Sequence, residues 1–176
     1  TKKSALCTLI LTEGDSAKST AMAGLEIIGR DKYGVFPLKG KPINVKDEKN
    51  AKKLLENKEL ANIKKIMGLE TNKVYKDTGE LRYGAIMILT DQDEDGSHIK
   101  GLIFTLFEKL WPCLFKMKGF LNSMLTPIVK AVNKKEVREF YSLKDYEKFS
   151  KEFPQLVAKM NVKYYKGLAT STPKEA

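Results

Sequence analysis

The sequence is poor in the residues that build disulfide frameworks and zinc sites. Its 176 residues include only two cysteines, Cys7 and Cys113, and one histidine, His98. Two separate cysteines cannot form a disulfide scaffold, and structural zinc sites take four Cys or His ligands. We therefore expect a chain of a reducing compartment, without disulfides or structural zinc.

Long hydrophobic runs are also missing. The longest apolar stretch, "LIFTLF" at 102–107, falls far short of the roughly 18 residues that span a bilayer. We expect no membrane segment. The chain also lacks an initial methionine, since it starts at Thr1, and we expect it to be a piece of a longer protein.

Acidic residues are in deficit overall. Lysine and arginine outnumber aspartate and glutamate by 32 to 22, which gives a formal net charge of +10. Such a balance favours a polyanionic partner, with nucleic acid as the first candidate and an anionic membrane surface as the second. The excess is strongest between residues 38 and 66, where nine lysines face four acids.

Hydrophobic periodicity predicts strands that alternate with helices. Buried strands are predicted at 7–14 and 85–91, each followed by a helix, at 15–28 and from 97 to Pro112. Further predicted elements are a strand at 33–45 broken by Pro37, exposed helices within 47–69, a polar loop at 68–84, strands within 119–132 and 138–142, and a helix near 143–153. The predicted fold class is α/β with a mostly parallel central sheet flanked by helices.

Four acidic side chains stand out because they follow the two predicted buried strands. Glu13 closes the first strand, and Asp91, Asp93 and Asp95 leave the second at spacing i, i+2, i+4, which in an extended backbone places them on one side. If the strands are neighbours, the carboxylates converge and need a cation. Oxygen ligands without a histidine partner favour Mg²⁺, Mn²⁺ or Ca²⁺.

Four other interpretations of the sequence motifs follow from their residues. "DQDEDG" matches the start of an EF-hand loop, but its twelfth position is Leu102 instead of glutamate. A solvated acidic turn remains open. "GVFPLKGKP" has five residues between its glycines, and Pro42 replaces the Ser or Thr of a nucleotide P-loop. His98 is predicted to cap or pack, and not to ligate a metal.

Five motifs together resemble the Toprim region of eukaryotic-type, or large-DNA-virus, type II DNA topoisomerases. They are "LILTEGDSAKS", "IGRDKYGVFPLKGK", "TDQDEDGSHIKGL", "TPIVKA" and "YYKGLATST", which cover nearly the whole chain. The resemblance implies a Rossmann-like Toprim domain over residues 1–132, with a basic insertion at about 46–82. Residues 133–176 would form a C-terminal extension toward a winged-helix domain.

The same resemblance implies roles for individual residues. Glu13, Asp91 and Asp93 would be the catalytic residues and hold Mg²⁺, which Mn²⁺ or Ca²⁺ can replace in binding, and Asp95 would be a supporting or alternative ligand. The implied contacts to double-stranded DNA are Lys39, Lys41, Asn44, Arg30 and Lys166. Ala169 stands where the family usually has a glycine, so the turn after Lys166 is a departure from the pattern.

The resemblance also implies parts that this chain does not contain. The nucleophilic tyrosine of the family lies in the winged-helix domain, so Tyr164 and Tyr165 are poor nucleophile candidates. The ATPase domain, which binds ATP, would lie upstream, and the parent protein would be a homodimer, nuclear if eukaryotic or in the compartment of viral replication if viral. We expect the isolated chain to be inactive. The alternatives are a Toprim-type primase or nuclease, and a non-catalytic basic DNA-binding module.

Overall fold

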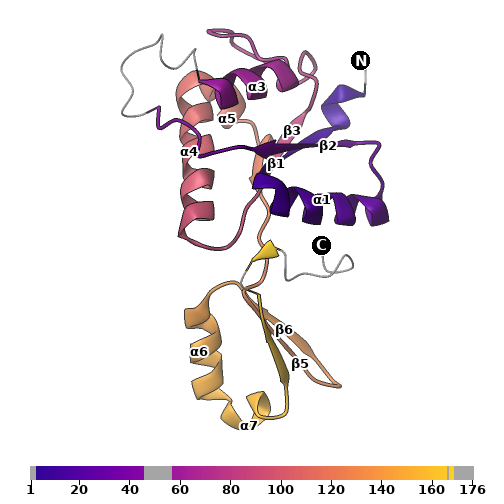
Figure 1. The fold of residues 1–176 in the computed structure, drawn as a ribbon, viewed down its shortest axis with the longest axis vertical. Helices are drawn as coiled ribbons and strands as arrows, with labels where there is room; N and C mark the ends of the chain where they lie inside the picture. Colours follow the sequence, from indigo (N-terminus) through magenta and orange to yellow (C-terminus); the bar gives the residue numbers. More distant parts are fainter. Residues whose placement is uncertain (1–2, 46–56, 166, 169–176) are drawn as a thin grey trace.

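The computed structural model describes residues 3–45, 57–165 and 167–168, which form two units joined end to end (Figure 1). The larger unit holds a four-stranded sheet with helices on both faces, and the smaller unit holds a three-stranded sheet with two helices. Within these described ranges, no helix has both the length and the apolar character needed to cross a membrane.

The larger sheet is parallel throughout, which confirms the predicted α/β class. Its strands are β1 (Thr8–Glu13), β2 (Tyr33–Leu38), β3 (Ala85–Leu89) and β4 (Leu121–Ser123), in the order β2-β1-β3-β4. β1 and β3 are nearly continuous apolar runs because both of their faces are covered, as is usual in parallel sheets.

Pro37 does not break β2, contrary to the prediction. Proline cannot donate a hydrogen bond to a neighbouring strand, so it is tolerated only where one side of the strand has no partner. β2 is the edge strand of the sheet, and Pro37 lies opposite Thr12 of β1. Because β2 lies at the edge, Pro37 costs the sheet no inter-strand hydrogen bond, which could not be known from the sequence alone.

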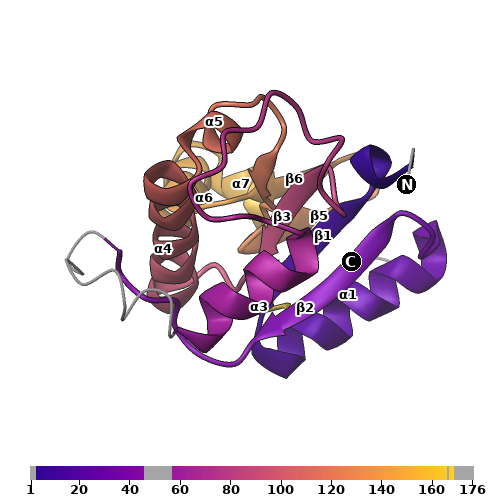
Figure 2. The ribbon, with the colours of Figure 1, turned by 90° about the horizontal axis from the view of Figure 1, so that it is seen from above.

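Helices cover the two faces of the sheet and create two separate cores. α1 (Gly14–Ile28) lies on one face, and α4 (Glu94–Leu110) lies on the opposite face with α3 (Lys58–Met67) and α5 (Pro112–Phe115), as Figure 2 shows. Alternate strand residues supply the cores: Leu9 and Leu11 of β1 join the α4 side, and Ile10 joins the α1 side. A short 3₁₀ helix (Ser4–Leu6) precedes β1.

α3 is not an exposed helix, which corrects the prediction for residues 47–69. Leu60, Ile63 and Met67 lie on one side of this helix and are buried in the larger core. Asn57 caps the amino end by accepting a hydrogen bond from the Leu60 N–H, and Gly68, with a φ of 76°, ends the helix. The lysines of α3 led to the prediction of an exposed helix, but they lie on one face and the opposite face is apolar. Residues 46–56 of the predicted insertion lie outside the described residues.

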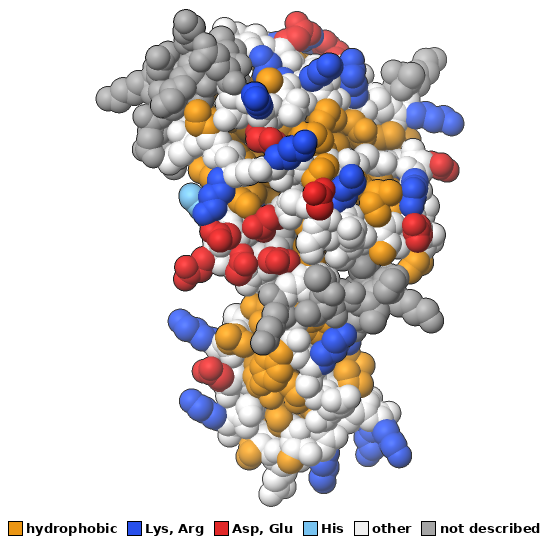
Figure 3. All heavy atoms as spheres, viewed as in Figure 1, with side chains coloured by type: hydrophobic (Ala, Val, Ile, Leu, Met, Phe, Trp, Pro, Cys, Tyr) orange, Lys and Arg blue, Asp and Glu red, His pale blue; other side chains and the backbone are white. Residues whose placement is uncertain are grey.

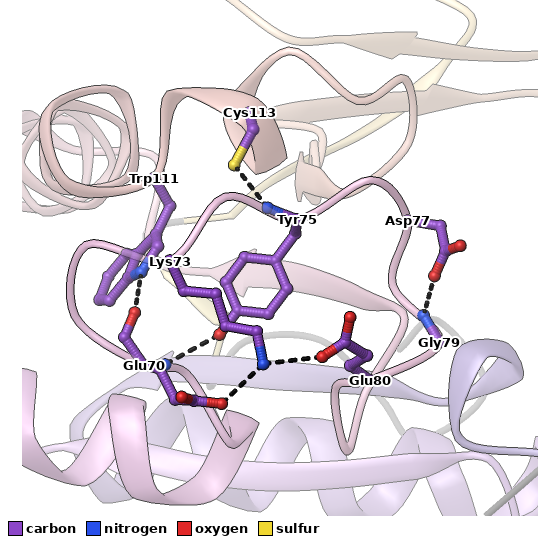
Figure 4. Close-up of polar contacts among 8 residues, drawn as sticks. All are labelled: Glu70, Lys73, Tyr75, Asp77, Gly79, Glu80, Trp111 and Cys113. Atoms are coloured by element: carbon purple, nitrogen blue, oxygen red, sulfur yellow. Dashed lines mark hydrogen bonds and ion pairs between the residues drawn. The ribbon is translucent and has the colours of Figure 1, made fainter.

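The loop at 68–84 follows α3 and is pinned by polar contacts (Figure 4). Lys73 lies 2.7 Å from Glu70 and 2.7 Å from Glu80. The buried Tyr75 hydroxyl accepts from the Glu70 N–H at 2.8 Å, and Trp111 Nε1 donates to the Glu70 carbonyl at 2.9 Å. The predicted loop is therefore present, and buried side chains fix it to the α4 face of the sheet.

The C-terminal unit is a separate antiparallel sheet. β5 (Val129–Val132) pairs with β6 (Val137–Phe140) and with β7 (Asn161–Tyr164), and α6 (Leu143–Glu152) and α7 (Pro154–Val157) connect β6 to β7. Its small core contains Ala131, Phe149 and Met160. The predicted boundary at residue 132 falls after β5, although β5 pairs within the second sheet. We propose that the division lies between β4 and β5 instead.

Candidate metal centre

The strand order brings the predicted acidic residues to one edge of the sheet. β1 lies directly beside β3, with Thr12 opposite Leu89, so Glu13 and Asp91 leave adjacent strand ends. From β1 the chain turns to β2 on one side and later to β3 on the other, which makes the β1/β3 boundary a topological switch point. Open α/β sheets bind ligands beyond the carboxyl ends of their strands at such a point.

Glu13 is the carboxylate of this edge whose charge is most strongly disfavoured by its surroundings. It occupies the N-cap position of α1, and Gly14, with a φ of 69°, lets the chain turn sharply from strand to helix. Its Oε2 atom is buried and has no hydrogen-bond partner within the described part of the chain. Burial raises the pKa of Glu13 first, and the negative charges of Asp93, Asp91 and Asp95 raise it further.

Asp93 and Asp95 belong to the beginning of α4 and do not lie in an extended segment. Asp93 is the N-cap, and one of its oxygens accepts from the Gly96 N–H at 2.7 Å. Asp95 is in the first turn, so the predicted i, i+2, i+4 alignment along one side is wrong beyond Asp93. The turn is also tight: a Cβ on Gly96 would lie 2.1 Å from the Asp91 carbonyl oxygen.

Lys41 forms an ion pair with this acidic edge. Its Nζ lies 2.6 Å from Asp95 Oδ1, and both side chains are more than half exposed. The hydrogen bond raises the pKa of Lys41 and lowers the pKa of Asp95. A residue predicted to contact DNA and one predicted to support the metal are therefore direct neighbours, which the sequence did not indicate.

Asp91 is held by a contact that sequence reasoning missed. Its Oδ1 atom accepts a hydrogen bond from the Leu168 N–H at 2.7 Å, across 77 residues of sequence. One feature of the sequence indicated that this segment belongs to the site, which was the similarity of "YYKGLATST" to the family. That similarity suggested a DNA contact of Lys166 and no contact with Asp91. Lys166 and Ala169 lie outside the described residues.

The remaining predicted DNA contacts separate into two groups. Lys39, Lys41 and Asn44 are exposed and follow β2, whose last residue, Leu38, lies opposite Glu13. The structure does not bring Arg30 to this edge. Arg30 precedes β2 at the opposite end of the sheet, about one strand length or ~17–20 Å away, and it pairs with Glu26 at 2.9 Å.

His98 interacts with the acidic edge only through its charge, which contributes to the lowered pKa of Asp95, and the two tyrosines lie in or next to the C-terminal unit. His98 is exposed on α4, whose cap is Asp93, so the predicted capping or packing role is wrong. Tyr164 is half exposed in the C-terminal unit, where its ring meets Tyr146 edge-on at 5.7 Å. The Tyr165 N–H donates to the Ile128 carbonyl.

The acidic residues form a local negative patch on a basic molecule. Figure 3 shows acidic side chains gathered at the end of the larger unit that faces the smaller one, with lysine and arginine side chains around them. Among residues 3–45, 57–165 and 167–168, no three His, Cys, Asp or Glu side chains are already arranged as a metal site. The donor set nevertheless fits a hard cation, because Glu13 Oε2 is buried without a partner and its neighbours are carboxylates.

Replacing Glu13 with glutamine is expected to stabilise the metal-free chain by a few degrees in Tm at neutral pH. The raised pKa of Glu13 means that its charged form destabilises the fold. The stabilisation from its protonated form is complete below the unfolded pKa and is lost as the pH rises through the raised folded pKa. The gain from Glu13→Gln should therefore shrink on acidification, which thermal unfolding between about pH 4 and pH 8 measures. A Tm of Glu13→Gln below that of the wild type at pH 7.5 would contradict this account.

The fold and the candidate site define an α/β domain of Rossmann-like type. It has a parallel four-stranded sheet, an acidic edge at the switch point and a small antiparallel sheet after it. Comparison with known families agrees with this class. Residues 8–122 match the Toprim domain, and residues 124–176 match the C-terminal associated domain of TOPRIM. The chain belongs to the Toprim family.

Three eukaryotic proteins illustrate the similarity of this chain to known sequences. The chain is 55% identical over 175 residues to DNA topoisomerase 2 of Plasmodium falciparum, covering 99% of this chain and 12% of the relative. It is 50% identical over 175 residues to DNA topoisomerase 2 of Pisum sativum, with the same coverages of 99% and 12%. It is 54% identical over 178 residues to DNA topoisomerase 2-beta of Homo sapiens, covering 99% of this chain and 11% of the relative.

A solved structure agrees with both units. The DNA-binding, cleavage and re-ligation domain of Plasmodium falciparum topoisomerase II matches with a TM-score of 0.88 and 52% identity, over 99% of this chain and 24% of that chain. The chain thus spans about one ninth to one eighth of the length of these topoisomerase relatives.

Proposed function

We propose that this chain is the cation-binding and DNA-contacting part of the cleavage and religation core of an ATP-dependent type II DNA topoisomerase. Such an enzyme changes DNA topology through a transient double-strand break. The observation that supports this best is the position of Glu13 at the switch point, where the charges of Asp93 and Asp91 raise its pKa. Glu13 Oε2 is buried there without a partner among the residues that the structure describes. The identity to topoisomerases over 99% of the chain supports it independently.

The proposed cation is Mg²⁺, with Mn²⁺ or Ca²⁺ able to replace it in binding. Glu13, Asp91 and Asp93 would hold it, and Asp95 is an alternative ligand once Lys41 leaves it. Bound there, the cation would supply Lewis-acid stabilisation of the attacking and leaving oxygens of a phosphodiester. Mg²⁺ typically takes one or two carboxylates and keeps water or phosphate oxygens, so four acids leave room for DNA.

The lysine turn after β2 is the proposed contact for double-stranded DNA. Lys41 lies 2.6 Å from Asp95, so a phosphate bound by Lys41 would lie beside the acidic centre. Lys39 and Asn44 share this exposed segment. The position of Arg30 at the far end of β2 removes it from the proposal.

The proposed parent protein supplies what this chain lacks. A tyrosine nucleophile and an ATPase domain would come from other parts of the polypeptide, and the parent would act as a nuclear homodimer, or in the compartment of viral replication if the protein is viral. The chain itself would bind the cation, position the phosphate through Lys41 and align the acidic edge. It would not complete the reaction alone.

Relaxation of supercoiled plasmid by the full-length protein tests the proposed function. With ATP and Mg²⁺, the linking number is expected to change in even steps, and chelation with EDTA should abolish the change. A Toprim-type primase or nuclease would synthesise primers or nick the plasmid without such steps. A non-catalytic DNA-binding module would shift plasmid mobility and leave the linking number unchanged. Either result would overturn the proposal.

Lys41→Ala is expected to weaken DNA binding several-fold and to reduce the slope of log K against log salt by about 0.9. Lys41→Arg should retain the slope because it keeps the charge. Lys32→Ala is the matched control, since Lys32 is an exposed lysine at the opposite end of β2. The measurement is fluorescence anisotropy of labelled duplex DNA at several salt concentrations. An unchanged slope in Lys41→Ala would remove Lys41 from the interface.

A further inference from the structure

Gly167 and Leu168 return from the C-terminal unit to the acidic edge of the larger sheet. β7 ends at Tyr164, and the Tyr165 N–H donates to the Ile128 carbonyl at 2.8 Å. Within three residues the Leu168 N–H donates to Asp91 Oδ1 at 2.7 Å. The chain therefore crosses from one unit to the other and ends this crossing on a carboxylate of the candidate metal centre.

Leu168 is held at three points. Its N–H binds Asp91 at the end of β3, and its carbonyl oxygen accepts a hydrogen bond from Thr20 Oγ1 of α1 at 3.4 Å. Its side chain is only 3% exposed and packs with Ile10, Leu25 and Leu89 in the core under α1. It also borders a cavity of about 240 Å³ in that core. A backbone N–H fixed on both sides in this way is a rigid donor.

Gly167 is confined by the same carboxylate. A Cβ on this residue would lie 2.9 Å from Asp91 Oδ2 and 3.2 Å from Cγ and Oδ1. The 2.9 Å approach is shorter than real Cβ contacts, so a side chain at position 167 would push the Asp91 carboxylate from its place. Gly167 and Leu168 thus both lie against one carboxyl group.

We propose that Gly167 and Leu168 are positioning residues that orient the Asp91 carboxylate for cation binding. That a cation binds at this edge is part of the proposed function, on which this inference rests. The Leu168 N–H occupies Oδ1 and fixes the plane of the group. Hydrogen bonds to ligating carboxylates typically change metal affinity by about 10- to 100-fold. Leu168 acts through Asp91 and has no role in contacting the cation.

The arrangement also ties the C-terminal unit to the acidic centre. Leu168 follows β7 by four residues, so movement of the small sheet relative to the larger one would pull on the Leu168 N–H. Asp91 would then lose its fixed orientation. The connection makes cation affinity depend on how the two units are docked, although the C-terminal unit supplies none of the proposed ligands.

Binding of Mn²⁺ by full-length variants in the absence of nucleotide tests this positioning role. Leu168→Ala and Gly167→Ala are expected to weaken Mn²⁺ binding at this centre by about 10-fold or more. Leu168→Met keeps the side-chain volume and should restore the affinity. Met124→Ala is the matched control, because Met124 borders the same cavity as Leu168 and its N–H binds the Ile88 carbonyl. Its Tm should fall while its affinity for Mn²⁺ stays within twofold of the wild type.

Amide hydrogen exchange tests the hydrogen bond between the Leu168 N–H and Asp91 independently of cation binding. Without metal, Asp91→Ala should speed exchange in peptides that contain Leu168, since the acceptor is lost, while Asp91→Asn should retain protection. Mn²⁺ affinities of Leu168→Ala and Gly167→Ala equal to that of the wild type would overturn the inference. If the wild type bound no Mn²⁺ at this centre, the proposed function would fail and the positioning role with it. Unchanged exchange in Asp91→Ala would overturn the contact and the positioning role that depends on it, while leaving the proposed function intact.

Discussion

Replacing Asp93 with asparagine in the full-length protein is expected to reduce DNA cleavage by at least roughly 100-fold, equivalent to about 3 kcal/mol of transition-state stabilisation. The substitution removes one negative ligand of the proposed cation. It keeps an oxygen that can accept the Gly96 N–H, which Asp93 binds at 2.7 Å as the N-cap of α4. Asparagine caps helices about as well as aspartate. The Tm should therefore stay close to that of the wild type.

Two further variants separate ligation from capping. Asp93→Ala should lose cleavage and also about 1 kcal/mol of stability, because it removes the cap as well as the charge. Asp15→Asn removes an exposed carboxylate in the first turn of α1 and should leave cleavage unchanged. The measurement is plasmid linearisation with Mg²⁺, beside thermal unfolding of each variant. If Asp93→Asn cleaved DNA at the wild-type rate, Asp93 would not be a ligand.

Trp111→Ala is expected to destabilise the 176-residue chain by about 3–5 kcal/mol. Trp111 is 1% exposed and packs against Phe107 with ring centroids 5.5 Å apart. Its Nε1 also donates to the Glu70 carbonyl at 2.9 Å, which fixes the loop at 68–84 to α4. The substitution would leave a large cavity and an unpaired carbonyl together. Urea unfolding, followed by circular dichroism, measures the loss.

Graded substitutions identify the cause of that loss. Trp111→Phe keeps most of the ring but removes the Nε1 donor, so its cost should be clearly smaller than that of Trp111→Ala. Phe153→Ala is the control, since Phe153 is 44% exposed and its truncation should cost less than about 1 kcal/mol. A Trp111→Ala variant as stable as Phe153→Ala would show that the α4 side of the sheet is not the main core.

The central strands and the acidic residues could be predicted because their signals are local. β1 has an apolar centre and ends in Glu13, β3 is apolar and is followed two residues later by Asp91, and the sequence shows these features directly. The predicted convergence depended on one unknown, which was whether the two strands are neighbours. The register with Thr12 opposite Leu89 confirms that they are. The proposed metal ligands themselves stay a prediction.

The misplaced predictions share a physical cause, which is that burial and pairing depend on distant residues. Pro37 was expected to break a strand, but the edge position of β2 leaves one side of that strand without a partner. α3 was expected to be exposed because its lysines hide an apolar face. Arg30 lies across β2 from the acidic edge, and its predicted contact with DNA stays a prediction. The contact between Asp91 and Leu168 spans 77 residues, so no local pattern could predict it.

The candidate metal centre is a place where stability and function are opposed. Glu13 is partly desolvated, repelled by Asp91 and Asp93, and left with one unpaired oxygen, so its charge costs stability in the metal-free chain. A cation would relieve all three effects at once. Lys41 forms an ion pair with Asp95, and its charge also interacts favourably with Glu13, although the pKa of Glu13 stays raised.

Anomalous diffraction from crystals soaked in Mn²⁺ tests the central claim most directly. The account predicts one or two anomalous peaks at the carboxyl end of β1 and β3, with Glu13 and at least one of Asp91 and Asp93 about 2.0–2.3 Å from a peak. Glu13→Gln crystals should lose or weaken that density. Peaks bound elsewhere, with Glu13 unligated at saturating Mn²⁺, would contradict the account.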